Sequence, residues 1–330
     1  MGNRSQLIGF GMYVPPQIIS NDYFSSYLDT SDQWIFDRTG ISERRWASVD
    51  TATSDLAANA AKAALANAGM SASSVDGIIV ATSSPDFVFP STACVVQKKI
   101  GATKGFAFDI NAACAGFVYA LTLADSLIKS GQAKNMLIIG ADIYSSLLDK
   151  NDRSTCVLFG DGAGAVLLTS NSSDANSGSG ILGSKFVADG NYDSLLCYNS
   201  GTACRTSADS INRGDHRLNM EGREIFKLAV RSMSDVSREL LGELGLTLDN
   251  IDAVIAHQAN MRILSAVAKE LHLPDSKMLS NVKYYGNTSA ATIPILLAES
   301  LEKGHVKQGD TVLFTAFGAG LAWGSNVVRL

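Results

Sequence analysis

Helical periodicity and short β-branched runs alternate along the chain. Apolar and small residues recur at helical spacing over 53–69, and a β-branched run follows at 77–81. The same order, a helix and then a strand, is predicted three more times: 117–131 and 135–140, 221–244 and 251–256, and 290–304 and 311–316. Alternation of this kind predicts a layered α/β fold.

One of these helical patterns occurs twice. Leu-Ala-Asp-Ser-Leu at 123–127 resembles Leu-Ala-Glu-Ser-Leu at 297–301, an offset of 174 residues (297 − 123). In both places a turn of small residues precedes the helix, a glycine ends it and a strand follows. We therefore expect two copies of one fold, residues 1–172 and 173–330, joined through the Ser/Asn/Gly-rich segment 170–180.

Composition agrees with a folded globular protein. Of the 330 residues, 46% are hydrophobic and 18% are charged, and the formal net charge of −5 argues against a nucleic-acid-binding surface. No apolar run approaches the ~18 residues that a membrane span requires. The five cysteines are odd in number and include no Cys-x-x-Cys pair, so we expect no metal site and a soluble protein in the reducing cytoplasm.

Cys114 lies among small residues just before the predicted helix 117–131. Free N–H groups at a helix start stabilise an anion, which predicts a thiol with a lowered pKa. The alternative is a buried, inert cysteine, the commoner fate of this residue type. Small neighbours leave room for a substrate beside the sulfur, and this favours a nucleophile.

His257 and Asn287 are the other candidates for chemistry. His257 ends a predicted strand, where catalytic groups collect in α/β sheets, although a structural role is the alternative. The remaining histidines, His216, His272 and His305, are interpreted as structural. Asn287 could cap the next helix, but it lies at the strand-to-helix junction of the second half that Cys114 occupies in the first. If the halves pack about a pseudo-twofold axis, Cys114, His257 and Asn287 share one pocket.

Five motifs in order carry a family resemblance. They are Asn111-Ala-Ala-Cys114-Ala-Gly-Phe, Gly160-Asp-Gly-Ala-Gly164, His257-Gln-Ala-Asn260, Gly286-Asn287-Thr-Ser-Ala-Ala and Phe317-Gly-Ala-Gly320. From about residue 8 to 330 the chain resembles 3-oxoacyl-[acyl-carrier-protein] synthase III, of the thiolase-like superfamily. The resemblance implies a duplicated five-layered αβαβα fold.

The resemblance also implies a reaction. Cys114 would take the acyl group of an acyl-CoA, and His257 and Asn287 would donate hydrogen bonds to the thioester carbonyl of malonyl-acyl carrier protein (ACP) as carbon dioxide leaves. The backbone N–H groups of Cys114 and Ala319 would hold the oxyanion. The product would be 3-oxoacyl-ACP, at the start of type II fatty acid biosynthesis, and no cofactor is implied because the CoA thioester is a substrate.

Further positions match binding residues of the family. Trp34 and Arg153 resemble the pair that sandwiches adenine, while Arg38 and Asn260 resemble other CoA contacts. Phe89 resembles a side chain that a homodimer partner inserts into the acyl pocket. The residues that resemble the ACP-docking positions are Lys227, Arg262 and Lys269, for which solvated helix charges are the alternative. For Trp34 the alternative is a half-buried aromatic side chain on a helix, and for Arg38 and Arg153 it is a solvated surface charge.

Other functions remain open on the residues alone. A thiolase proper needs a second cysteine in the C-terminal half, and no cysteine follows Cys204. Elongation synthases use two histidines, whereas this chain has Asn287 in place of the second. A specialised synthase that uses an unusual acyl-CoA and malonyl-CoA, a cysteine hydrolase and a non-catalytic acyl-CoA-binding protein are the alternatives. The long polar segment 197–217 is a candidate lid that bears on the choice of primer.

Overall fold

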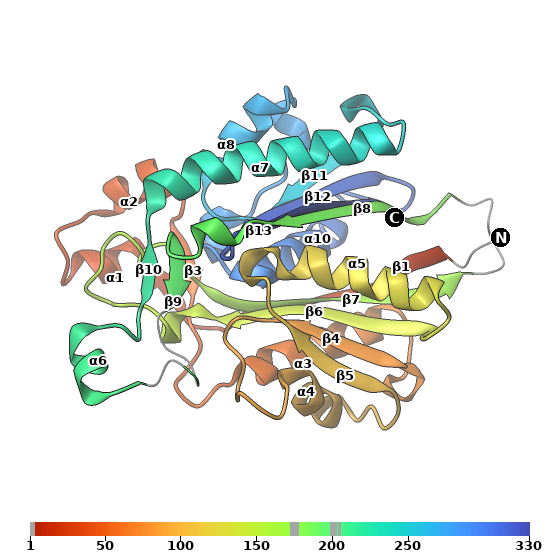
Figure 1. Ribbon diagram of the computed structural model, residues 1–330, viewed down its shortest axis with the longest axis horizontal. Coiled ribbons are helices and arrows are strands. Elements are labelled where there is room, and N and C mark those ends of the chain that lie inside the picture. Colours follow the sequence, from red (N-terminus) through yellow and green to blue (C-terminus); the bar gives the residue numbers. More distant parts are fainter. Residues whose placement is uncertain (1–3, 172–177, 199–202, 204–205) are drawn as a thin grey trace.

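The computed structural model describes residues 4–171, 178–198, 203 and 206–330. It consists of alternating layers of helices and sheets (Figure 1). Two helices cover the outer face of each sheet and two more lie between the sheets, so the predicted αβαβα arrangement is confirmed. The outer helices are α3 (Thr53–Asn67) and α4 (Thr92–Ile100) on one side and α7 (Gly222–Glu243) and α8 (Met261–Glu270) on the other; the central ones are α5 (Gly116–Lys129) and α10 (Thr292–Glu302).

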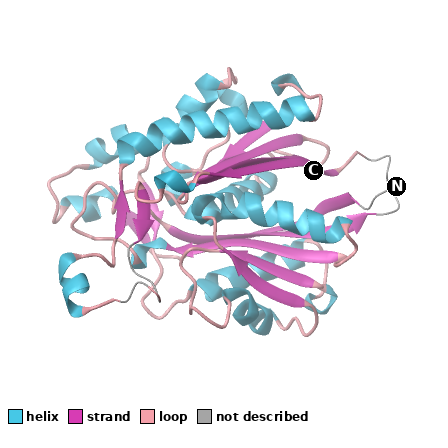
Figure 2. Cartoon of the chain, viewed as in Figure 1, coloured by secondary structure: helices cyan, strands magenta, loops and turns pink. Residues whose placement is uncertain are grey.

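The two sheets repeat one topology, visible as the two bands of magenta strands in Figure 2. The first has the order β1-β7-β6-β4-β5 and the second the order β8-β13-β12-β11. In each sheet the first three strands are antiparallel neighbours and the next pairing is parallel. The strands are β1 (Arg4–Tyr13), β4 (Gly77–Ala81), β5 (Phe106–Ile110), β6 (Asn135–Ile143) and β7 (Asp161–Asn171), then β8 (Gly180–Ala188), β11 (Ala253–Ala256), β12 (Thr311–Gly318) and β13 (Ala322–Arg329).

The duplication is confirmed by this topology, but its register differs from the predicted one. β4 and β11 begin at Gly77 and Ala253, and β6 and β12 begin at Asn135 and Thr311, so the halves are offset by 176 residues (253 − 77 and 311 − 135). The offset of 174 is wrong because it equates Leu123, which is 36% exposed, with the buried Leu297. Two helical segments can have similar sequences although the residues aligned in this way lie on different faces of the two helices.

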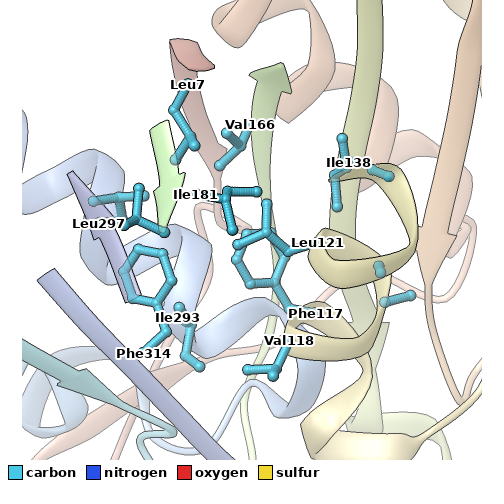
Figure 3. Close-up of a cluster of buried hydrophobic side chains, with 14 of the residues drawn as sticks. Leu7, Phe117, Val118, Leu121, Ile138, Val166, Ile181, Ile293, Leu297 and Phe314 are labelled. Carbon is cyan, nitrogen blue, oxygen red and sulfur yellow. The ribbon is translucent and has the colours of Figure 1, made fainter. Parts of the chain in front are cut away.

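The core that joins the halves surrounds α5 and α10 (Figure 3). Phe117 and Leu121 of α5 lie beside Ile293 and Leu297 of α10, and Phe314 of β12 packs edge-on against Phe117. Both helices are buried on most sides because each contacts both sheets. This shared core fixes the starts of the two helices relative to each other.

Shorter elements complete the described chain. The predicted boundary between 172 and 173 lies outside the described residues, and so does part of the candidate lid 197–217. In the described ranges no helix has both the length and the apolar character to cross a membrane. The remaining helices and strands are β2 (Ile18–Ser20), α1 (Asn21–Ser25), α2 (Asp32–Thr39), β3 (Glu43–Arg45), β9 (Leu196–Tyr198), α6 (Ala208–Arg213), β10 (Leu218–Met220) and α9 (Val282–Tyr285).

Candidate active site

A cavity of about 650 Å³ lies where the two halves meet. Cys114, His257 and Asn287 all line it, so the structure brings together the three residues that the sequence singled out. Apolar side chains from β9, β10 and α7 form much of the remaining wall, and arginines lie among the lining residues. The wall includes Leu158, Phe159, Leu196, Met220, Ile225, Phe226, Met233 and Phe317, together with Arg38, Arg223 and Arg262.

Cys114 lies in a 3₁₀ turn (Ala113–Ala115) that leads into α5, and it is 5% exposed. Its Sγ lies 3.5 Å from the hydroxyl of Ser289. Burial raises the pKa of the Cys114 thiol to about 12. The prediction that the helix start lowers this pKa is therefore wrong, because α5 begins two residues later and the loss of water outweighs its N–H groups.

The backbone of Gly318 packs directly on the Cys114 turn. A Cβ atom at Gly318 would lie 2.7 Å from the backbone N of Cys114 and 2.9 Å from the carbonyl O of Ala112. Only glycine fits this approach. Gly318 ends β12, so the next residue, Ala319, begins the turn into β13 beside the nucleophile.

His257 follows β11 directly and is buried. Its Nδ1 lies 2.8 Å from the hydroxyl of Thr292, the first residue of α10. Burial lowers the pKa of His257 to about 3, so the imidazole is neutral at physiological pH. With Nδ1 held by Thr292, Nε2 is the ring nitrogen that remains for a substrate.

Asn287 both caps its own turn and faces the cavity. Its Oδ1 accepts a hydrogen bond of 2.9 Å from the backbone N of Ser289, which leaves the amide Nδ2 as a donor. Asn111 makes the equivalent bond, 3.1 Å, to the N of Ala113 in the first half. Under the offset of 176, Asn287 therefore corresponds to Asn111, so the two junctions match while the residue opposite Cys114 is Ala290.

Three functional candidates were missed by sequence reasoning: Ser289, Asp142 and Tyr144. Ser289 is fully buried and adopts a positive φ of 53°, a strained conformation that often marks functional sites. Asp142 is also fully buried, near the end of β6. A charged residue inside the apolar run 136–143 was a signal that could have found it.

Three of the four candidate CoA residues, Trp34, Arg38 and Arg153, are in contact, and Arg38 also lines the cavity. The Arg38 and Arg153 guanidinium carbons lie 4.2 Å and 4.5 Å from the centre of the Trp34 ring. An adenine between Trp34 and Arg153 would have to separate them, since they are in direct contact. Arg153 also donates to the backbone carbonyl of Asp29. Asn260 lines the cavity and caps α8 by accepting from the N of Ile263, at 3.0 Å.

The candidate carrier-docking residues are spread over α7 and α8. Arg262 and Lys227 line the cavity, and Lys227 pairs with Glu224 at 2.8 Å. Lys269 is exposed two turns further along α8. The Phe89 side chain is 85% exposed, in a loop that also exposes Phe87 and Val88.

Comparisons with known proteins agree with this geometry. The family model described as 3-oxoacyl-[acyl-carrier-protein (ACP)] synthase III matches residues 108–190, and the model for its C-terminal part matches residues 241–330. These two stretches contain Cys114, His257 and Asn287.

Relatives cover the whole chain. Beta-ketoacyl-[acyl-carrier-protein] synthase III of Clostridium perfringens is 47% identical, with 99% of both chains covered, and that of Ruegeria sp. is 45% identical with 100% of both covered. The crystal structure of 3-oxoacyl-[acyl-carrier-protein] synthase III from Aquifex aeolicus has a TM-score of 0.90 at 47% identity, covering 99% of this chain and 100% of that one. The fold is thus the thiolase-like fold that the motifs implied. Identity at this level over the full length means that the chain belongs to the 3-oxoacyl-[acyl-carrier-protein] synthase III family of acyltransferases.

Proposed function

We propose that this protein condenses an acyl-CoA primer with malonyl-ACP, giving 3-oxoacyl-ACP, CoA and carbon dioxide, and so initiates type II fatty acid biosynthesis. The observation that carries the proposal is the convergence of Cys114, His257 and Asn287 on one mostly apolar cavity. A thiol, a neutral imidazole and a carboxamide in a dry pocket suit thioester exchange followed by stabilisation of an enolate.

In the first half-reaction, the sulfur of Cys114 attacks the thioester carbon of the primer and CoA leaves. Backbone N–H groups of Cys114 and Ala319 are suited to hold the oxyanion, because within the described residues neither N–H donates to a backbone carbonyl of a turn, loop or cap. The close packing of Gly318 on the Cys114 turn supports this pairing, since it brings the two backbone segments together. No cofactor enters this step, because the CoA thioester is itself the substrate.

In the second half-reaction, the malonyl thioester loses carbon dioxide and its carbanion attacks the acyl carbon on Cys114. His257 and Asn287 donate to the thioester carbonyl through Nε2 and Nδ2, the atoms that their partners Thr292 and Ser289 leave available. For His257 this requires the tautomer with the proton on Nε2, in which the single Thr292 hydroxyl proton turns from the carbonyl O of Ser289 to Nδ1. Donors aimed at developing charge in such a pocket are worth about 3 to 4 kcal/mol each.

The proposal extends to partners. CoA binds to Trp34, Arg38, Arg153 and Asn260. The acidic carrier docks on the cations Lys227, Arg262 and Lys269, which carry local positive charge on a protein whose net charge is −5. The exposed Phe89 inserts into a second copy of the chain, forming a homodimer. Cys114 must be a free thiol to act as the nucleophile, which fits the reducing cytoplasm.

Incubation with radiolabelled acyl-CoA tests the proposal. We expect stable label on Cys114, release of one CoA per site, and product only when malonyl-ACP is added. Cys114→Ala should abolish the label, whereas Cys94→Ala, at an exposed cysteine outside the cavity, should leave it intact. Rapid appearance of free acid would indicate a hydrolase, and binding without label would indicate a non-catalytic protein.

A further inference from the structure

A buried polar network lies behind the sulfur of Cys114. The Ser289 hydroxyl, 3.5 Å from Sγ, also interacts with the carboxyl of Asp142 and the phenol of Tyr144. Neither Ser289 nor Asp142 is among the described residues that line the cavity. Ser289 therefore contacts the sulfur from outside the cavity, whereas Tyr144 is part of the cavity wall.

Asp142 is surrounded by hydrogen-bond donors. Its Oδ1 accepts from the hydroxyl of Thr82 at 3.1 Å, from the N of Ser83 at 2.8 Å, and from the N and hydroxyl of Ser84 at 3.1 Å and 2.8 Å. Its Oδ2 accepts from the N of Ala290 at 3.2 Å. Burial raises the pKa of Asp142, whereas these donors and the Ser289 hydroxyl lower it because they stabilise the ionised form. Asp142 is thus a buried acid, surrounded by donors that favour its carboxylate, that the proposed mechanism has not used.

The proposed acyl transfer leaves one proton without a destination. Cys114 must lose its thiol proton as the new S–C bond forms, and its burial raises the thiol pKa and so favours the protonated form beforehand. Among the described residues, the Ser289 hydroxyl is the side-chain hydrogen-bond partner found for Sγ. His257 is engaged at Nδ1 by Thr292, and the proposed second half-reaction requires Nε2 to carry a proton, so it is not free to accept one.

We propose that Ser289 and Asp142 form a proton path for Cys114, an inference that rests on the proposed function. As Sγ bonds to the acyl carbon and the bond to CoA breaks, the thiol proton passes to Ser289 Oγ, while the Ser289 hydroxyl proton passes to the Asp142 carboxylate. The departing CoA thiolate takes a proton from water.

The path returns its proton in the condensation step. The tetrahedral intermediate expels Cys114 as a thiolate, which recovers the proton from Asp142 through Ser289. One proton from solvent is consumed per turnover. This balances the overall reaction. The malonyl group loses carbon dioxide, the resulting carbanion forms the new C–C bond, and CoA leaves as a thiol.

Single-turnover acyl transfer tests the path, read as CoA thiol released per site after mixing with acyl-CoA. Ser289→Ala and Asp142→Asn should each slow this step by at least about tenfold, and the double variant should be no slower than the slower single variant, because both residues act in series. Ser83→Ala is the matched control. It removes another hydroxyl of the network, which contacts Asp142 at 3.3 Å and Tyr144 at 3.0 Å but has no hydrogen bond to the sulfur, and it should stay within about twofold of the wild type.

Electrostatics alone predicts the opposite sign for Asp142→Asn. After burial, the Asp142 charge is a further cause that raises the pKa of the Cys114 thiol, so its removal would speed acyl transfer. A faster Asp142→Asn variant, or a folded Ser289→Ala variant at the wild-type rate, would overturn the path. If Asp142→Asn fails to fold, the comparison of Ser289→Ala with Ser83→Ala still decides. Wild-type protein that takes no acyl group on Cys114 would instead refute the proposed function.

Discussion

The Nδ1 atom of His257 lies 2.8 Å from the hydroxyl of Thr292, and this hydroxyl lies 2.9 Å from the carbonyl O of Ser289. Thr292 thus connects the imidazole to the strained turn that also contacts the sulfur of Cys114. Thr292, the first residue of α10, therefore orients His257, which follows strand β11. Among the described residues, this hydroxyl is the hydrogen-bond partner found for the His257 side chain.

Thr292→Val should impair His257 without removing it. Valine has the same shape but cannot hydrogen-bond, so Nδ1 is left buried without a partner, at a cost of about 1 to 3 kcal/mol. We expect malonyl decarboxylation to slow by about tenfold or more, with acyl transfer to Cys114 much less affected. Thr292→Ser keeps the hydroxyl and should retain most of the activity. Equal loss in both variants would contradict a role for this hydrogen bond.

The neutral His257 predicts acid sensitivity of the fold. Its pKa falls to about 3 in the folded protein, against about 6.5 when unfolded, so below pH 6.5 only the unfolded chain takes up this proton. The free energy of unfolding therefore does not change with this titration above pH 6.5. It falls by about 1.4 kcal/mol per pH unit as the pH decreases from 6.5 toward 3. Urea unfolding of His257→Gln between pH 7 and 5 should show a shallower loss than the wild type. His305→Gln, at an exposed histidine, should follow the wild type.

Trp34 is predicted to act in CoA binding and not in chemistry. Trp34→Ala removes the ring that both Arg38 and Arg153 contact, so we expect the KM for acyl-CoA to rise by about tenfold with kcat nearly unchanged. The KM for malonyl-ACP should not change. Phe36→Ala, at an exposed aromatic on the same helix, provides the control. A fall in kcat alone would argue against the binding role.

Arg262 is predicted to bind the carrier electrostatically. Arg262→Glu reverses a charge at the cavity and should raise the KM for malonyl-ACP by about tenfold or more at low salt. The difference from wild type should shrink as the ionic strength rises to 0.5 M, because screening weakens the attraction. Lys307→Glu makes the same charge change at an exposed site on another part of the chain and should have little effect. A salt-independent defect would indicate a structural role.

Sequence reasoning identified Cys114, His257 and Asn287 because local patterns placed each at the end of a strand or the start of a helix. It could not find the contact between Ser289 and Asp142, because 147 residues separate them in the chain (289 − 142) and the packing of the 3₁₀ turn Ser289–Ala291 beside β6 brings them together. The pKa of Cys114 was mispredicted for a related reason. Burial is a property of the assembled halves, and it outweighed the local effect of the helix start.

Gly318 offers the strictest test of how the second half supports the nucleophile. Gly318→Ala places a Cβ within 2.9 Å of three backbone atoms of the Cys114 turn, none of which is the flexible end of a side chain. The turn must therefore move, which should cost about 1 to 3 kcal/mol of stability and displace the Cys114 N–H from its place in the oxyanion site. We expect acyl transfer to fall by at least a hundredfold, since one such donor is worth about 10² to 10³ in rate. Gly242→Ala is the matched control, because nothing lies within 4 Å of its Cβ position on α7, and alanine there should stabilise the helix by about 0.5 to 1 kcal/mol. Normal acyl transfer by Gly318→Ala would mean that the close contact between β12 and the Cys114 turn has no part in the reaction.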